Sequence, residues 1–425
     1  MNLIDCVHAA GRRCVLTLLL VFGSAAPFSL ASAAGGVLTL DEAITRARAD
    51  APQLAAARAT LEAANHSVSG AGRLPDPELI LGVDNLPTDS FSLGHDFMTM
   101  HKIGVMQSVP NGAKRRLQGE LAAREVDLAE AQLSVTSLET ARAAADAWIN
   151  CAVAAQSLQR LRDLRRDLGP QSAVTRAALA SGRTNAGEAL SSEAALARLD
   201  LRILELEQRL ATGRAELARW VGEGSTLEPG DLPWKRDLDP AVSVVSNLST
   251  HALVAPAASG VALAHTRVEL AKAEKRPDWS AELTYADRGP GFSDLVSLEF
   301  RVGLPLFTRN RQNPAIGARL ADARAEEAAQ EAAIRMHRAE VEAALAGWRA
   351  GRTRLAYYDS ELLPLAKDRS RALTAAYGAG QTQMRPVLEA LGDQAELELA
   401  YVELAGEVTR SWVFLNLLHA PGESP

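Results

Sequence analysis

Four short segments of the chain alternate between apolar and polar residues with a period of two. They cover about 76–87, 97–109, 278–287 and 294–306. The last is the clearest, because every second position is apolar: Val296, Leu298, Phe300, Val302 and Leu304. Such alternation predicts strands of a sheet with one apolar and one polar face. Segments of about ten residues also suit tilted membrane strands, although the period alone leaves a small soluble sheet as an alternative.

Between these segments, apolar residues recur at three- and four-residue spacing among Ala, Glu and Arg residues. This period predicts helices that bury an apolar stripe against partner helices. We expect a leading helix at about 39–70 and another at about 240–275. Two long helical hairpins should follow, at about 113–222 and about 315–419.

The first helix of each hairpin is unusually long for a globular protein. A helix from about 113 to 180 would be roughly 100 Å long, whereas the average globular helix has about 11–12 residues. Each of the two long helices contains one proline, Pro170 or Pro364. A proline inside a helix removes a hydrogen bond, so we expect a kink at both positions.

The chain also shows an internal repeat with a spacing of nearly 200 residues, which is the first feature to seek in a long helical sequence. Four matches occur in the same order: Leu74-Pro75-Asp76 with Arg276-Pro277-Asp278, Val109-Pro110 with Leu304-Pro305, Trp148 with Trp348, and residues 181–185 with 379–383. We therefore expect a first repeat at 34–230 and a second at 231–425.

Residues 1–33 predict an export signal. Arg12 and Arg13 supply positive charge, an apolar run follows from Val15 to Phe22, and the Ala-Ser-Ala sequence at 31–33 fits a cleavage site. No later segment approaches the roughly 20 apolar residues of a membrane-spanning helix. If the mature chain enters a membrane, it must do so with its strands.

Composition and charge exclude several classes of function. The 45 basic and 52 acidic residues are interspersed and form no basic stripe, so nucleic acid is not an expected partner. No HExxH, GxSxG, Walker-type or CxxC motif is present, and the histidines lack metal-ligand spacing. Cys151 is the one cysteine outside the predicted signal. We therefore expect no enzyme, no cofactor and no internal disulfide.

The strand count predicts an oligomer if the sheet meets lipid. Four strands cannot close a membrane sheet, because the smallest single-chain examples have about eight. An open edge in hydrocarbon leaves backbone groups without hydrogen bonds, at several kcal/mol each. Three copies would supply twelve strands, and their long helices could close into one tube.

The order of elements resembles that of the TolC-type outer membrane efflux proteins. The residues that carry the resemblance are Ser108-Val109-Pro110 ahead of Lys114-Arg115, and Val302 to Phe307 ahead of the polar residues 308–311. The resemblance covers the mature chain. It implies a mainly α fold with a small β part, in which a homotrimer forms an α-barrel of coiled helices and a twelve-stranded transmembrane β-barrel.

The resemblance also implies a function, partners and a location. Members of the family export substrates passively through the outer membrane, with a long periplasmic extension. They receive these substrates from an inner-membrane pump of the resistance-nodulation-division (RND) type through a periplasmic adaptor. The hairpin turns would then be the tips that the adaptor contacts: Gly182, Arg183, Thr184, Gly380, Gln381 and Thr382. An ordinary helical turn without a partner is the alternative for these residues.

The family places carboxylates six and nine residues after each tip glycine, facing the pore. In this chain Glu188 and Glu389 occupy two of the four positions, while Ser191 and Pro386 occupy the others. By resemblance, the two glutamates would form charged rings that favour cations. A solvated glutamate on a helix face is the alternative.

The cargo indicated by the sequence is heavy-metal cations such as copper or silver. Gly82–Pro87 and Phe97–Met100 are similar to the heavy-metal branch of the family. A cluster of soft ligands lies nearby: His95, Met98, Met100, His101 and Met106. The cluster does not converge on one strand face, so packing is the alternative. Export of drugs or other small organic molecules stays open, as does a soluble periplasmic coiled-coil adaptor.

Overall fold

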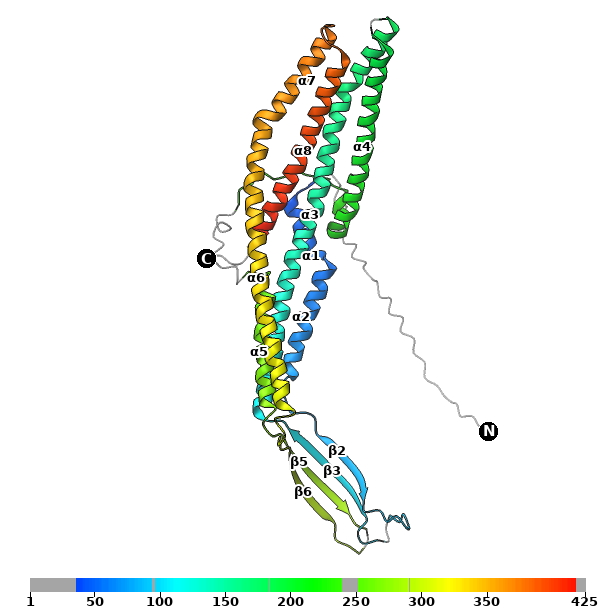
Figure 1. Cartoon of the computed structure of the whole chain (residues 1–425). Helices are drawn as coiled ribbons and strands as arrows, with labels where there is room; N and C mark the ends of the chain where they lie inside the picture. The colour runs from blue at the N-terminus through cyan, green and yellow to red at the C-terminus, as the bar shows by residue number, and fades with distance from the viewer. Residues whose placement is uncertain (1–35, 94–95, 183, 239–250, 290, 418–425) are drawn as a thin grey trace, which may run out of the picture. The chain divides into compact units, whose positions relative to one another are not determined.

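The computed structural model describes residues 36–93, 96–182, 184–238, 251–289 and 291–417. The predicted signal, 1–33, lies outside the described residues. Val37–Pro425 forms one unit by its internal contacts. Within this unit, long helices dominate and a single four-stranded sheet lies at one end of them (Figure 1). The predicted fold class, mainly α with a small β part, is confirmed.

The predicted leading helix at 39–70 is two helices, α1 (Leu40–Asp50) and α2 (Pro52–Gly70). Thr39 begins α1 as its N-cap and accepts a hydrogen bond from the Glu42 amide at 3.2 Å. The break follows from Pro52, because a residue before proline is disfavoured in the helical region. Ala51 accordingly has φ −65° and ψ 123°.

The predicted helix at 240–275 is α5 (Ala255–Ala273). Its expected start was wrong, since residues 251–254 form a bend and turn. Pro256, in the first turn of α5, suits a helix start, because proline lacks the amide hydrogen that would be unsatisfied there. Residues 239–250 lie outside the described part of the chain.

The two predicted long hairpins are confirmed. In the first, α3 (Gly112–Ala180) has 69 residues and α4 (Ala186–Val221) returns beside it. The short helix η1 (Gly222–Thr226) follows. Pro170 lies inside α3, which continues as one helix through that position.

The second hairpin is interrupted where the first is continuous. It consists of α6 (Gln312–Tyr357), a π-helical turn η4 (Tyr358–Leu362), α7 (Leu363–Gly378) and the returning α8 (Met384–Leu417). Pro364 lies in the first turn of α7. The π turn widens the helix just before this proline, so the interruption expected at Pro364 takes the form of a π bulge.

The four predicted strands form one antiparallel sheet in the order β2–β3–β5–β6. Their bounds are β2 (Glu78–Asp84), β3 (Met100–Val109), β5 (Trp279–Asp287) and β6 (Leu295–Val302). Each strand is shorter than its predicted segment, and Leu304 was wrongly included in the last one. A separate parallel pair joins β1 (Val37–Leu38) to β4 (Glu228–Pro229).

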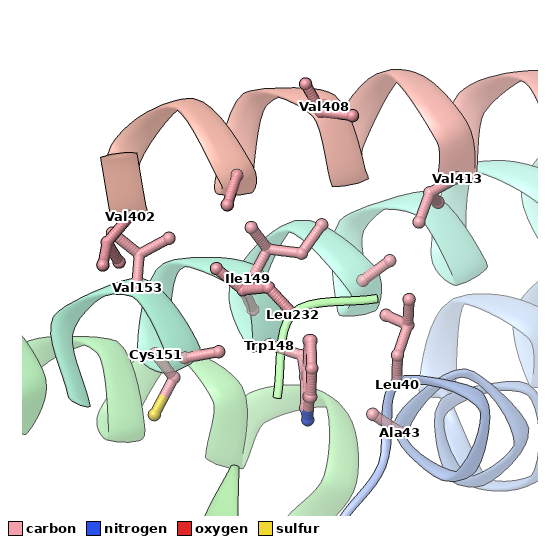
Figure 2. Close-up of a cluster of buried hydrophobic side chains, with 14 of the residues drawn as sticks. Leu40, Ala43, Trp148, Ile149, Cys151, Val153, Leu232, Val402, Val408 and Val413 are labelled. Atoms are coloured by element: carbon pink, nitrogen blue, oxygen red, sulfur yellow. The ribbon is translucent and has the colours of Figure 1, made fainter. Parts of the chain in front are cut away.

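The main apolar core lies among α1, α3, α4 and α8 (Figure 2). Trp148 is buried and donates a hydrogen bond from its indole nitrogen to the Leu38 carbonyl at 2.8 Å. A second cluster extends the core toward the hairpin turns with leucines of α3, α4 and α8. Small residues permit close approach of α3 and α8: a Cβ atom on Gly406 would lie 2.6 Å from a methyl group of Val153.

Gly406 provides a test of this close approach. Gly406→Ala should lower the free energy of unfolding, because overpacking costs about 1–3 kcal/mol and exceeds the gain in helix propensity. The measurement is the thermal unfolding midpoint of the purified protein. Gly392→Ala in the same helix is the matched control: nothing lies within 4 Å of its added Cβ, so it should be neutral or stabilising by up to about 1 kcal/mol. Equal shifts in both variants would contradict the proposed close contact.

Candidate functional site

One face of the sheet is apolar and exposed. In register across the four strands, Leu81 lies opposite Ile103, Ile103 opposite Tyr285, and Tyr285 opposite Val296. Their exposed fractions are 69%, 50%, 44% and 71%. The neighbouring row of the same face is equally exposed: Leu79, Val105, Leu283 and Leu298. A contiguous apolar surface of this kind marks an interaction site rather than a face that solvent covers.

The opposite face of the sheet is polar and ion-paired. Arg301 lies 2.6 Å from Glu282 and 2.7 Å from Glu299. Lys102 lies 3.1 Å from Asp84 on the neighbouring pair of strands. Glu282 is only 7% exposed, so the sheet shields its polar face better than its apolar face. This is the reverse of a soluble sheet, in which the apolar face packs against the core.

The sheet has two open edges. β2 and β6 are the outer strands, and each pairs on one side only (Figure 1). All eight residues of β6 are exposed. Open edges of this length are normally covered or paired with another chain. Among the described helices, none is long and apolar enough to cross a membrane.

A partly buried polar contact fixes the junction between the sheet and α3. The Lys114 ammonium lies 2.6 Å from one oxygen of Asp278, and the Asn111 amide donates to the other at 2.8 Å. Partial burial alone would raise the pKa of Asp278, but these two hydrogen bonds hold it below its ordinary value. The contact joins the first turn of α3 to the residue before β5, which lies 164 residues further along the chain.

The hairpin turns have the geometry expected for glycine. Gly182 has φ +67° and Gly380 has φ +73°, a region that other residues rarely adopt. At the second turn, the Gln381 amide donates to the Ala376 carbonyl at 2.8 Å and the Gly380 amide to Tyr377 at 2.9 Å. This pair of bonds ends the helix in a Schellman motif.

The other predicted tip residues are partly accessible. Thr184 and Thr382 are half-buried and Gln381 is exposed, whereas Arg183 lies outside the described residues. Added Cβ atoms on Gly182 and Gly380 would meet nothing within 4 Å. Both turns therefore present an open surface in the single chain, and no described residue packs over the two glycines.

Each of the two glutamates predicted to face the pore forms a local contact at the start of its own helix. Glu188 accepts a hydrogen bond from the Thr184 hydroxyl, and its amide donates to Asn185 at 2.9 Å. This arrangement caps α4. Glu389 lies 2.9 Å from Arg385 in the first turns of α8 and its side chain is 55% exposed. Both carboxylates therefore have partners already, and the structure of one chain does not bring them together.

The Met and His cluster does not converge in the structure. Met98 precedes β3 and is 47% exposed. Met106 accepts a contact from Arg301 at 3.4 Å. A ring nitrogen of His101 lies 3.3 Å from the Leu93 carbonyl. His95 lies outside the described residues. Within the described ranges, no three His, Cys, Asp or Glu side chains are placed to hold a metal ion.

Sequence reasoning missed a charged groove along the hairpins. A cavity of about 730 Å³ lies between α3, α7 and α8. Its lining is largely charged: Arg160, Asp163, Asp167, Lys367, Arg371 and Glu398. Interhelical ion pairs join the hairpin helices elsewhere, such as Arg209 with Glu403 at 2.5 Å and Arg369 with Asp393 at 2.6 Å. The residues of such pairs are dispersed along the sequence, and helical periodicity does not identify their partners.

Comparison with known proteins agrees with this geometry. A model of the outer membrane efflux protein family matches residues 43–223, somewhat under half of the chain. No curated protein matches the chain. Among solved structures, the outer membrane protein VceC from Vibrio cholerae has a TM-score of 0.75 and 18% identity, and the match covers 89% of this chain and 95% of VceC.

Two further structures show the same fold. The open state of the MtrE outer membrane channel from Neisseria gonorrhoeae has a TM-score of 0.75 and 15% identity, with 89% of this chain and 88% of MtrE covered. CusC, solved in a study of folding and transmembrane channel formation, has a TM-score of 0.74 and 14% identity, with 89% and 91% covered. The chain therefore matches the outer membrane efflux protein family over residues 43–223, and over most of its length it has the fold of outer membrane channels.

Proposed function

We propose that the chain is the outer-membrane channel subunit of a tripartite efflux system and works as a homotrimer. The observation that carries the proposal is the reversed sheet. Its apolar face is exposed, while the opposite face contains ion pairs such as Arg301 with Glu282. An exposed apolar face suits contact with lipid, and a polar face suits a water-filled interior.

The number of strands sets the number of copies. Each chain supplies four strands with two open edges, and an open edge cannot lie in hydrocarbon because its backbone groups would have no hydrogen-bond partners. Three chains of four strands give a closed twelve-stranded sheet, above the minimum of about eight. The hairpins of three chains would then form one tube in the periplasm.

The hairpin turns are the proposed contact for a periplasmic adaptor, which in turn binds an inner-membrane RND pump. Gly182 and Gly380 lie at turns that no other part of the described chain covers. The residues next to them would contribute to the same surface: Arg183, Thr184, Gln381 and Thr382. A soluble periplasmic adaptor is the less favoured function, because it would leave the exposed apolar face of the sheet without a partner.

The proposed cargo is heavy-metal cations such as copper or silver. Support comes from the sequence similarity at Gly82–Pro87 and Phe97–Met100, and from Glu188 and Glu389. Three-fold symmetry would make each glutamate a ring of three carboxylates, which attracts cations. The Met and His cluster is not part of the proposal, because its side chains do not converge. Drugs or other small organic molecules are the alternative cargo.

Leu298 and Ser297 allow a test of the membrane sheet. Leu298 is 62% exposed on the apolar face, and Ser297 lies next to it on the polar face. Leu298→Arg should reduce insertion into the outer membrane, because an arginine facing lipid near the midplane costs about 2–4 kcal/mol. Ser297→Arg carries the same charge into the interior and should insert normally. The measurement is the amount of trimer in the outer-membrane fraction; equal amounts for both variants, or release of the wild type with soluble periplasm, would contradict the proposal.

Glu389 allows a separate test of the cation pathway. Glu389→Ala should lower the cation preference and conductance of purified trimers in planar bilayers, because it removes three negative charges from the pore. Glu331→Ala is the matched control, since Glu331 forms the same kind of pair with an arginine four residues away, Arg335, in α6. Unchanged conductance and selectivity for Glu389→Ala would remove Glu389 from the pore and leave the channel itself intact.

A further inference from the structure

The seam between the two strand pairs within the chain is closed by a specific contact. β3 and β5 pair in register from Val109 opposite Trp279 to His101 opposite Asp287. At the helix-side end of this seam, Asp278 accepts from Lys114 at 2.6 Å and from the Asn111 amide at 2.8 Å. Asp278 lies just before β5, and Lys114 lies five residues after the end of β3.

The open edges carry the counterparts of these two residues. The repeat relates Asp278 to Asp76, which precedes β2, and relates Val109-Pro110 to Leu304-Pro305, which follow β6. At the spacing of five residues, Lys114 then corresponds to Arg309, although Lys114 lies in the first turn of α3 and Arg309 lies in the turn ahead of α6. Asp76 and Arg309 are exposed, and neither has an ion pair or side-chain hydrogen bond among the described residues. In the described part of the chain, a carboxylate thus lies just before β2 and a guanidinium lies in the turn after β6, each without a partner.

We propose that Arg309 of one chain binds Asp76 of the next, at the seam where β6 of the first chain meets β2 of the second in the closed sheet. The proposal rests on the trimer proposed above and defines its subunit contact. The partner is a second copy of this chain, and the contact repeats the one that Lys114 and Asp278 form within it.

The repeat also sets the register of the seam. If Leu304 takes the place of Val109 and Pro77 that of Trp279, then Val302 lies opposite Leu79, Phe300 opposite Leu81 and Leu298 opposite Val83. All six residues are exposed on the apolar face of the single chain: Leu79, Leu81, Val83, Leu298, Phe300 and Val302. Opposite residues in an antiparallel pair point to the same face. A slip of one residue would place polar side chains of one strand on the apolar face, so the derived register agrees with the faces.

Reversal of the two charges tests the ion pair. Asp76→Arg and Arg309→Asp should each raise the dissociation rate of the detergent-purified trimer, on the order of tenfold, because three seams contain the pair. The double variant should restore the wild-type rate. Asp76→Arg combined with Arg311→Asp is the matched control, since Arg311 is also exposed and without a side-chain partner in the described part of the chain; it should not restore the rate. Rescue by Arg311→Asp, or no rescue by Arg309→Asp, would overturn the pairing.

Cysteine cross-linking tests the register independently. Leu81→Cys with Phe300→Cys should give covalent trimers after mild oxidation, because opposite Cβ atoms lie about 4.5–5.5 Å apart, near the range for a disulfide. Leu81→Cys with Glu299→Cys or Arg301→Cys places the thiols on opposite faces and should link at least several-fold less. Cys151 is buried and should not compete.

The outcomes separate this inference from the proposed function. Preferential linking by an off-register pair overturns the derived register. A trimer by light scattering without any of these cross-links leaves the channel standing and overturns the seam. A monomer by light scattering overturns both.

Discussion

The structure depends on one constraint: every backbone amide and carbonyl of the sheet needs a hydrogen-bond partner. In water the outer edges of β2 and β6 could bind solvent, but the exposed apolar face between them favours lipid, where no such partners exist. In the proposed channel, a four-stranded sheet meets this need by pairing its edges with other copies of the chain. Under that proposal, oligomerisation is a condition of folding for this part of the chain, not a later association of finished subunits.

The helical part meets a different constraint, because it can bury its own apolar surface. Trp148 and its neighbours form a core within one chain (Figure 2). Helix α3 packs against α1, α2, α4, α5 and α8. Alanine and glycine permit close spacing, as at Gly406 against Val153. We infer that each chain can form its hairpins before assembly, whereas the sheet needs its partners. The partly buried contact of Asp278 with Lys114 links these two parts.

Much of the fold could be predicted from the sequence, because each strand and helix shows its own period of apolar residues. Alternation located all four strands and helical spacing located both hairpins. One error arose where a single residue acts on the backbone, because Ala51 before Pro52 broke a helix that the sequence predicted as continuous. The interruption expected near Pro364 is present, but its form, the π turn at Tyr358–Leu362, was not predicted. Neither changes the period of apolar residues. The sequence also identified which strand face is apolar, but only the structure showed that this face is exposed and the polar one shielded.

The site was harder to predict, because its chemistry depends on contacts between distant segments or between chains. The ion pair of Arg301 with Glu282 joins β6 to β5, and Arg209 with Glu403 joins α4 to α8. No spacing rule in the sequence selects these partners. Glu188 and Glu389 were chosen by their distance from the tip glycines, and both already serve their own helix starts in the single chain. In the proposed trimer, a pore ring built from either glutamate would start from these local contacts. A change in the pore would therefore also change the hydrogen bonds and ion pairs in the first turns of α4 and α8.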